Sequence, residues 1–232
     1  MSVSLTIWLS VCSATTIAIA TTWRRGLGEV RYFVRWYLLA ALAEDCATHF
    51  ALLRFGYRSA EYKYVYFGAD LAVVVIGFFV LARLVELAFE KSSLRLPGVR
   101  AIALLVFTGL AICSAVVVYM LRGGLSTGTL GLELEQNFSF LGMVLAIVLF
   151  AVINVIQVEG VRFRRLVLSF SLLYGAGAII YSLTAIVPQF REVTTYAVPI
   201  TSLAGMLLIA YSLWVPEPEM APGLTRRFEV AA

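Results

Sequence analysis

The chain has 232 residues, of which 61% are hydrophobic and only 14% are charged, with 18 basic and 14 acidic side chains. A soluble domain of this size needs more polar residues to cover its surface, so the composition favours a protein of the lipid bilayer. Apolar windows occupy nearly the whole sequence, which leaves no room for a soluble catalytic, kinase or nucleic-acid-binding domain. The net charge of +4 is therefore interpreted through membrane topology.

A helix that spans a bilayer needs about 20 mostly apolar residues, and seven windows of the sequence meet this condition. They cover residues 4–22, 32–54, 63–88, 98–121, 137–158, 166–188 and 195–215. We therefore predict an all-α polytopic membrane protein. A single bundle of seven transmembrane helices occupies residues 1–215, and a short cytoplasmic tail follows over residues 216–232.

Basic residues divide unevenly between the two sides of this bundle. One side carries Arg24, Arg25, Arg31, Lys91, Arg95, Arg100, Arg162, Arg164, Arg165, Arg226 and Arg227. The other side carries Arg54, Arg58, Lys63, Arg122 and Arg191. Because cytoplasmic loops are enriched in lysine and arginine, the richer side is assigned to the cytoplasm. The N-terminus is then outside the cell and the C-terminus inside, in the inner (plasma) membrane.

The first window has no basic residue before it and two directly after it, which predicts a retained helix and not a cleaved signal peptide. The second window enters the membrane with an expected interfacial belt of aromatic and basic groups, formed by Tyr32, Arg35, Trp36 and Tyr37. All three cysteines lie inside windows, so we interpret them as buried packing thiols and not as a disulfide framework. They are Cys12, Cys46 and Cys113.

Polar residues interrupt the second and third windows in their outer halves. Asp45 and His49 are four residues apart and therefore share one face of a helix. The same spacing relates the polar residues of the third window, which are Tyr62, Tyr66 and Asp70. At ~1.5 Å per residue, counting inward from the outer charges places both aspartates about 10–14 Å deep. The two carboxyl groups can therefore meet at one level.

Ionised carboxylates cost about 2.5–3.5 kcal/mol each at mid-membrane, so they face the bundle interior and find partners there. Two interpretations of this cluster remain open. In one, a polar network locks the second and third helices together. In the other, a ligand or proton site opens to the outside, and its residues are Glu44, Asp45, His49, Tyr62, Tyr66 and Asp70. Glu44 points about 100° away from Asp45, so it joins the site only if the helix is enclosed on two sides.

No metal site is predicted. Asp45, His49 and Asp70 are the side chains nearest to a ligand set. The chain has one histidine, and no His-x-x-x-His or Cys-x-x-Cys pair accompanies these residues, whereas metal sites usually combine several such ligands.

Three further features predict contacts between or along the helices. Arg83 and Glu86 are three residues apart near a cytoplasmic helix end, which predicts a local ion pair. Asn154 and Gln157 are amides expected to hydrogen-bond to a neighbouring helix. Small residues in the sixth and seventh windows, at 175–178 and 202–205, predict close packing of these two helices.

Several activities are excluded by the residues present. The seventh window has no lysine for a retinal Schiff base, and a single histidine cannot supply the paired axial ligands of a cytochrome-b-like haem bundle. The sequence also lacks His-Glu-x-x-His, Gly-x-Ser-x-Gly and the Walker loop. We therefore expect no enzymatic activity and no cofactor.

The start of the third window, Tyr62-x-Tyr64-x-Tyr66-x-x-x-Asp70, runs into an apolar helix that ends in Arg83-x-x-Glu86. This pattern resembles a family of uncharacterised bacterial seven-helix inner-membrane proteins, in which an aromatic-rich start of the third helix precedes an acid. The resemblance implies the layout and a bacterial source, and it implies no known activity. The seven-span layout also resembles the sensor input modules of some bacterial signalling proteins.

The functional hypothesis is a sensor-like or accessory binding module with a small outward-facing polar pocket between the second and third helices. Its expected contacts are the lipid bilayer and a cytoplasmic or membrane protein that binds the basic inner loops 91–100 and 159–165. Nucleic acid is not an expected partner. One alternative is a transporter of protons or a small solute, and another is a purely structural subunit of a membrane complex.

Overall fold

The structure is a computed structural model, and it describes the chain in five main segments with additional positions between them. The segments are 2–23, 30–57, 59–90, 161–187 and 190–215, and the additional positions are 101, 105, 108, 109, 112, 116, 120, 137, 140–151 and 153. Every regular element in these residues is a helix, which confirms the predicted all-α fold class.

Five long helices have defined bounds. They are α1 (Ser2–Thr21), α2 (Val30–Phe55), α3 (Ala60–Glu90), α6 (Val161–Ile186) and α7 (Arg191–Trp214). A shorter apolar helix covers Phe140–Ala151. These helices coincide with predicted windows to within a few residues, while most of the fourth window and the end of the fifth lie outside the described residues. Residues 161–165, expected in a basic inner loop, are instead the first residues of α6, since arginine is a good helix former.

Three of the described helical stretches are long and apolar enough to cross a membrane, namely Ala60–Phe89, Val161–Ile180 and Tyr196–Trp214. In α2 the apolar sequence is interrupted by Glu44, Asp45 and His49, so this helix does not reach the same hydropathy despite its 26 residues. The polar cluster thus sits in the least apolar of the long helices.

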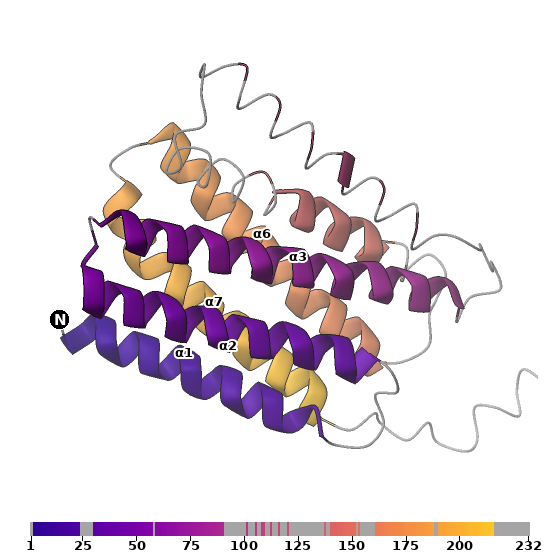
Figure 1. Ribbon diagram of the computed structural model, residues 1–232. Helices are drawn as coiled ribbons and strands as arrows, with labels where there is room; N and C mark the ends of the chain where they lie inside the picture. The colour runs from indigo at the N-terminus through magenta and orange to yellow at the C-terminus, as the bar shows by residue number, and fades with distance from the viewer. Residues whose placement is uncertain are drawn as a thin grey trace, which may run out of the picture.

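The helices pack as neighbours in an order that differs from their order in the sequence. α2 packs against α3, α1 packs against both α2 and α7, and α7 packs against α6 (Figure 1). The first and last helices of the chain therefore lie side by side, which closes the bundle.

A tight turn joins α2 to α3 and fixes the register of this pair. Gly56 ends α2 with a positive φ of 81°, a conformation that glycine adopts without the steric cost of a Cβ. Ser59 then caps α3, since its Oγ accepts a hydrogen bond from the backbone N–H of Tyr62 at 3.0 Å.

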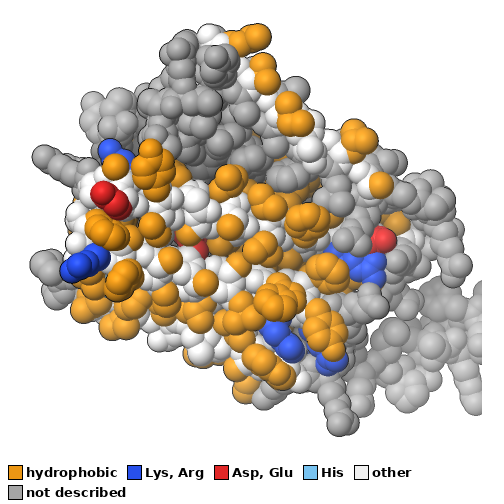
Figure 2. Space-filling model, in the orientation of Figure 1, with side chains coloured by type: hydrophobic (Ala, Val, Ile, Leu, Met, Phe, Trp, Pro, Cys, Tyr) orange, Lys and Arg blue, Asp and Glu red, His pale blue; other side chains and the backbone are white. Residues whose placement is uncertain are grey.

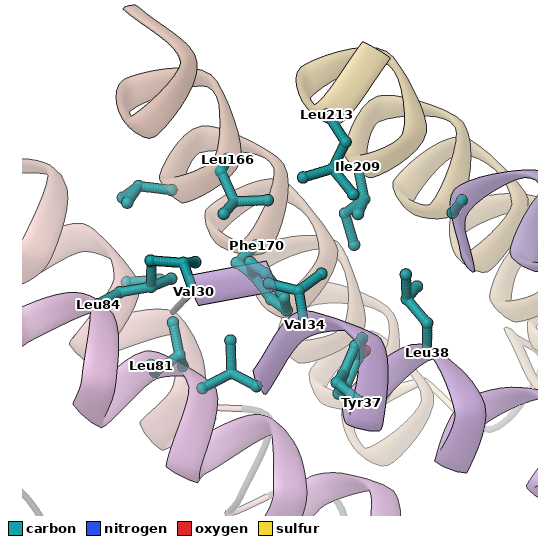
Figure 3. Close-up of a cluster of buried hydrophobic side chains, with 14 of the residues drawn as sticks. Val30, Val34, Tyr37, Leu38, Leu81, Leu84, Leu166, Phe170, Ile209 and Leu213 are labelled. Atoms are coloured by element: carbon teal, nitrogen blue, oxygen red, sulfur yellow. The ribbon is translucent and has the colours of Figure 1, made fainter. Parts of the chain in front are cut away.

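The core lies toward the end of the bundle where α2 and α6 begin. Fully or nearly fully buried side chains from four helices meet there (Figure 3), and they include Val34 and Leu38 of α2, Leu81 and Leu84 of α3, Leu166 and Phe170 of α6, and Ile209 and Leu213 of α7. Lipid tails are as apolar as leucine, so close packing, and not exclusion from water, holds these helices together in a bilayer.

Tyr174 of α6 is wedged between two glycines on other helices. A Cβ at Gly77 of α3 would lie 1.9 Å from the Tyr174 hydroxyl oxygen, and a Cβ at Gly142 would lie 2.5 Å from its ring. The predicted close packing of α6 and α7 is confirmed at Gly205, where a Cβ would lie 2.5 Å from Leu173. Small residues thus set the distances between helices where large side chains are inserted.

Arginines at the start of α2 and α6 bind the ends of the antiparallel helices beside them. Arg35 donates hydrogen bonds to the hydroxyl and carbonyl oxygens of Thr22, at 2.9 and 3.1 Å, just beyond the end of α1. Arg162 donates to the carbonyl oxygen of Val215, at 3.2 Å, just beyond the end of α7. A guanidinium group at a helix C-terminus donates hydrogen bonds to carbonyl groups that have no partner within the helix. Its positive charge is also attracted by the partial negative charge at that end of the helix dipole. The predicted ion pair between Arg83 and Glu86 is also present.

The surface is apolar along the helices, with lysine, arginine and acidic groups gathered mainly at the two ends of the face in Figure 2. Of the predicted interfacial belt, Trp36 is 66% exposed, as the belt requires, whereas Tyr37 is only 4% exposed, so its assignment to the belt is wrong. The next residue on a helix turns by about 100°, so adjacent aromatic residues reach opposite environments. Cys46 is exposed, so the prediction of a buried thiol is wrong for this residue. Cys113, Asn154 and Gln157 lie outside the described residues.

Candidate functional site

The predicted polar cluster lies in the half of the bundle nearest to the turn at Gly56. α2 carries Glu44, Asp45 and His49, and α3 carries Tyr62, Tyr66 and Asp70, all six at least partly buried. The two helices pack directly against each other. A small acidic patch is visible in the seam between them in Figure 2.

Asp45 and His49 both contact α1, a helix that the sequence did not connect with the cluster. The indole N–H of Trp8 donates a hydrogen bond to the backbone carbonyl oxygen of Asp45 at 3.1 Å. The Trp8 ring also stacks on the His49 imidazole, with ring centroids 4.0 Å apart and an angle of 12° between the planes. Trp8 therefore fixes the His49 ring against α1.

Glu44 lies on another part of α2 and interacts electrostatically with Tyr62 of α3. Tyr62 belongs to a row of aromatic rings that continues along the start of α3. Its ring centroid lies 5.6 Å from that of Tyr57 and 6.0 Å from that of Tyr66, and Tyr66 in turn meets Phe67 edge to face at 5.3 Å. The structure thus combines one carboxylate with several aromatic rings at this end of α3.

Asp70 is connected with the interior of the bundle through two buried tyrosines. The Tyr174 phenol of α6 interacts electrostatically with Asp70. Tyr37 of α2 interacts electrostatically with four groups, which are Tyr174, Glu44, Asp70 and Asp45. Tyr37 is therefore a buried polar side chain in the electrostatic surroundings of both aspartates.

The two aspartates of the predicted site are not joined directly in the structure. The structure gives no hydrogen bond or ion pair between Asp70 and the side chains of Asp45 or His49 in the described part of the chain. No group of three or more histidine, cysteine, aspartate or glutamate side chains that could hold a metal ion occurs among the described residues. Asp45, His49 and Asp70, the nearest metal candidates, are therefore not gathered into a ligand set.

Three residues of the cluster were not anticipated from the sequence. Trp8 and Tyr174 belong to α1 and α6, and only the packing of the bundle brings them to α2 and α3. Tyr37 carried a readable signal, because it lies seven residues before Glu44 and so shares its helical face. A buried tyrosine or tryptophan also tends to place its polar atom near a partner, which marks both residue types in an apolar window as polar sites.

Comparisons with known proteins give no relative for this chain: no protein-family model, no curated protein and no solved structure matches it.

Proposed function

We propose that the chain is a multi-pass protein of the bacterial inner membrane, with seven transmembrane helices, an external N-terminus and a cytoplasmic C-terminus. It acts as a sensor-like or accessory binding module, and its site is a small polar pocket that opens outward between α2 and α3. The three apolar helical stretches of membrane-spanning length support the membrane location. The excess of arginine at the starts of α2 and α6 supports the orientation.

One observation carries the binding role, which is the division of the bundle into a polar and an apolar half. The polar side chains of the cluster reach inward as far as Tyr37 and Tyr174, and the buried hydroxyls of Ser169 and Ser212 beyond them bond to each other and to backbone carbonyls. The Tyr37 ring then meets Phe170 edge to face, with centroids 5.3 Å apart, and Phe170 is fully buried in the apolar core. A site accessible from one side suits a sensor, whereas a transporter needs polar groups along a complete route through the protein.

The basic inner segments 91–100 and 159–165 are the proposed contact surface for a cytoplasmic or membrane protein partner. Residues 91–100 lie outside the described part of the chain, and Arg164 at the start of α6 is exposed. A partner that receives the signal is part of the proposed sensor role.

Trp8 offers a direct test of ligand binding, because its indole stacks on His49. Purified protein in nanodiscs is titrated with protons, inorganic cations and small organic solutes while tryptophan fluorescence is followed. We expect one class of solute to change the emission saturably, and the Trp8→Phe variant to lose this change. Asp70→Asn is expected to lose it as well while remaining folded and monodisperse. If the fluorescence response is unchanged in both Asp70→Asn and Asp45→Asn, the cluster only holds α2 and α3 together, and the proposed binding role is wrong.

Transport and topology are tested separately. Movement of protons or of the same solute down a gradient in proteoliposomes would overturn the sensor in favour of a transporter. A reporter fused after Ala232 that is active only on the external side would refute the proposed orientation.

A further inference from the structure

Five arginines gather at one end of the bundle, in the first turns of α2 and α6. This inner arginine cluster consists of Arg31, Arg35, Arg162, Arg164 and Arg165. The two helix starts lie together, since Val30 of α2 and Leu166 of α6 belong to the same core cluster (Figure 3). The cluster therefore concentrates positive charge over a small part of the surface.

The described contacts of these guanidinium groups are all with neutral groups. Arg31 donates to the Tyr32 hydroxyl at 3.1 Å, and the Arg165 guanidinium lies 5.6 Å from the centroid of the Tyr211 ring. Arg35 and Arg162 bind the ends of α1 and α7, as described above. The structure gives no ion pair between any of the five and a described carboxylate, and Glu86 near this end of α3 pairs with Arg83. The described carboxylates therefore do not neutralise the cluster, and we look for its counter-anion outside these helices.

Two donors of the cluster also have no hydrogen-bond acceptor among the residues that the structure describes. The Arg31 Nε and the Arg165 Nη1 are both buried and unpaired. A buried donor without an acceptor is costly, and the cost is larger when the group is charged. One of these atoms belongs to α2 and the other to α6. A donor without an acceptor therefore lies on each side of the cluster.

Exposed aromatic side chains place the cluster at the depth of lipid headgroups. Tyr32 and Trp36 of α2, Trp23 after α1, and Tyr211 and Trp214 of α7 are all exposed at this end. Such rings are enriched at the interface between hydrocarbon and water. An arginine there meets lipid phosphates, whose oxygens match the planar donors of a guanidinium group.

We propose that anionic phospholipid headgroups of the inner leaflet bind the inner arginine cluster, with Arg31 and Arg165 as the specific contacts. The phosphate supplies the negative charge that the cluster lacks, and its oxygens accept hydrogen bonds from the accessible part of these half-buried guanidinium groups. Basic sites between helices on the cytoplasmic side are suited to such headgroups. The site lies at the opposite end from the polar cluster, so its failure would leave the proposed binding role untouched.

The test measures thermal unfolding and lipid binding of the full chain in a neutral detergent. Phosphatidylglycerol is compared with phosphatidylcholine, and native mass spectrometry counts the bound lipids. We expect phosphatidylglycerol to raise the unfolding temperature and to bind more tightly. The variant Arg31→Gln/Arg165→Gln is expected to bind phosphatidylglycerol about tenfold more weakly, since each substitution removes a charge-assisted contact with the headgroup.

A matched control removes the same charge at the other end of the bundle. The variant Arg54→Gln/Lys63→Gln is expected to keep wild-type binding of phosphatidylglycerol. An equal loss in this control, or equal effects of the two lipids, would overturn the proposal. The same measurement is repeated with glycerol phosphate and with inorganic phosphate. If either anion binds as tightly as phosphatidylglycerol at the same concentration, the site binds a free anion, and the proposal of a lipid site is refuted. If the glutamine variant does not fold, Arg31→Lys/Arg165→Lys, which keeps the charge and loses the planar donors, decides the question by the same measurement.

Discussion

Gly77 allows a sharp test of the packing around Tyr174. In Gly77→Ala the new Cβ would lie 1.9 Å from the Tyr174 hydroxyl oxygen and 3.2 Å from both Cζ of Tyr174 and Cε2 of Tyr37. The tyrosine cannot simply move away, because Gly142 already holds its ring from another helix. Overpacking of this kind costs about 1–3 kcal/mol, while replacing a helical glycine by alanine gains roughly 0.5–1 kcal/mol. We therefore expect a net destabilisation of about 0.5–2 kcal/mol.

A double-mutant cycle isolates the clash. Tyr174→Phe removes the atom that lies 1.9 Å from the new Cβ and leaves contacts of 3.2 Å. Gly77→Ala should therefore be nearly neutral in the Tyr174→Phe background. Gly68→Ala in the same helix is the control, since nothing lies within 4 Å of its Cβ position. The stability of all five proteins, the control included, is measured by unfolding in detergent with heat or denaturant. Equal destabilisation by Gly77→Ala with and without the Tyr174 hydroxyl would refute the reasoning.

Three further tests of the contacts between helices use the same unfolding measurement. Arg35→Gln should cost about 1–2 kcal/mol through the loss of its bonds to Thr22, whereas Arg164→Gln, at an exposed site, should change stability by less than about 0.5 kcal/mol. Trp8→Phe should cost about 1 kcal/mol by removing the donor to the Asp45 carbonyl, and an unchanged stability would contradict that hydrogen bond. Ser169→Ala and Ser212→Ala should be coupled by about 0.6 kcal/mol through their 3.0 Å hydrogen bond, and strict additivity would argue against it.

The positions of the helices were predictable because the bilayer imposes a simple condition. A spanning segment must be apolar over about 20 residues, so the windows at 32–54 and 63–88 could be found without any knowledge of packing. The ends were predictable for similar reasons, since Gly56 and Ser59 are typical residues for ending one helix and starting the next. The prediction of a loop at residues 161–165 is wrong because charged residues end a membrane span without ending the helix.

The faces of the helices were not predictable, because apolar side chains point both to lipid and to the core. Trp36 and Tyr37 are adjacent and chemically similar, yet one is exposed and the other is buried. The contact of Trp8 with His49 depends on α1 packing against α2, and the contact of Tyr174 with Gly77 depends on α6 approaching α3. In a soluble protein a polar helix face would reveal these choices. In this protein most of the described helices have no such polar face.

The division of the polar cluster has a consequence for the proposed sensor. Trp8 of α1 donates a hydrogen bond to the backbone carbonyl of Asp45, whereas Tyr174 of α6 is inserted beside Gly77 of α3, the helix that carries Asp70. Both α1 and α6 pack against α7, so the two sides of the cluster converge on this one helix. α7 also ends beside the first turn of α6, where Arg162 binds the Val215 carbonyl. In the proposed sensor, α7 is therefore the element through which a change at α2 or α3 would be passed to the end of the bundle that carries the arginines.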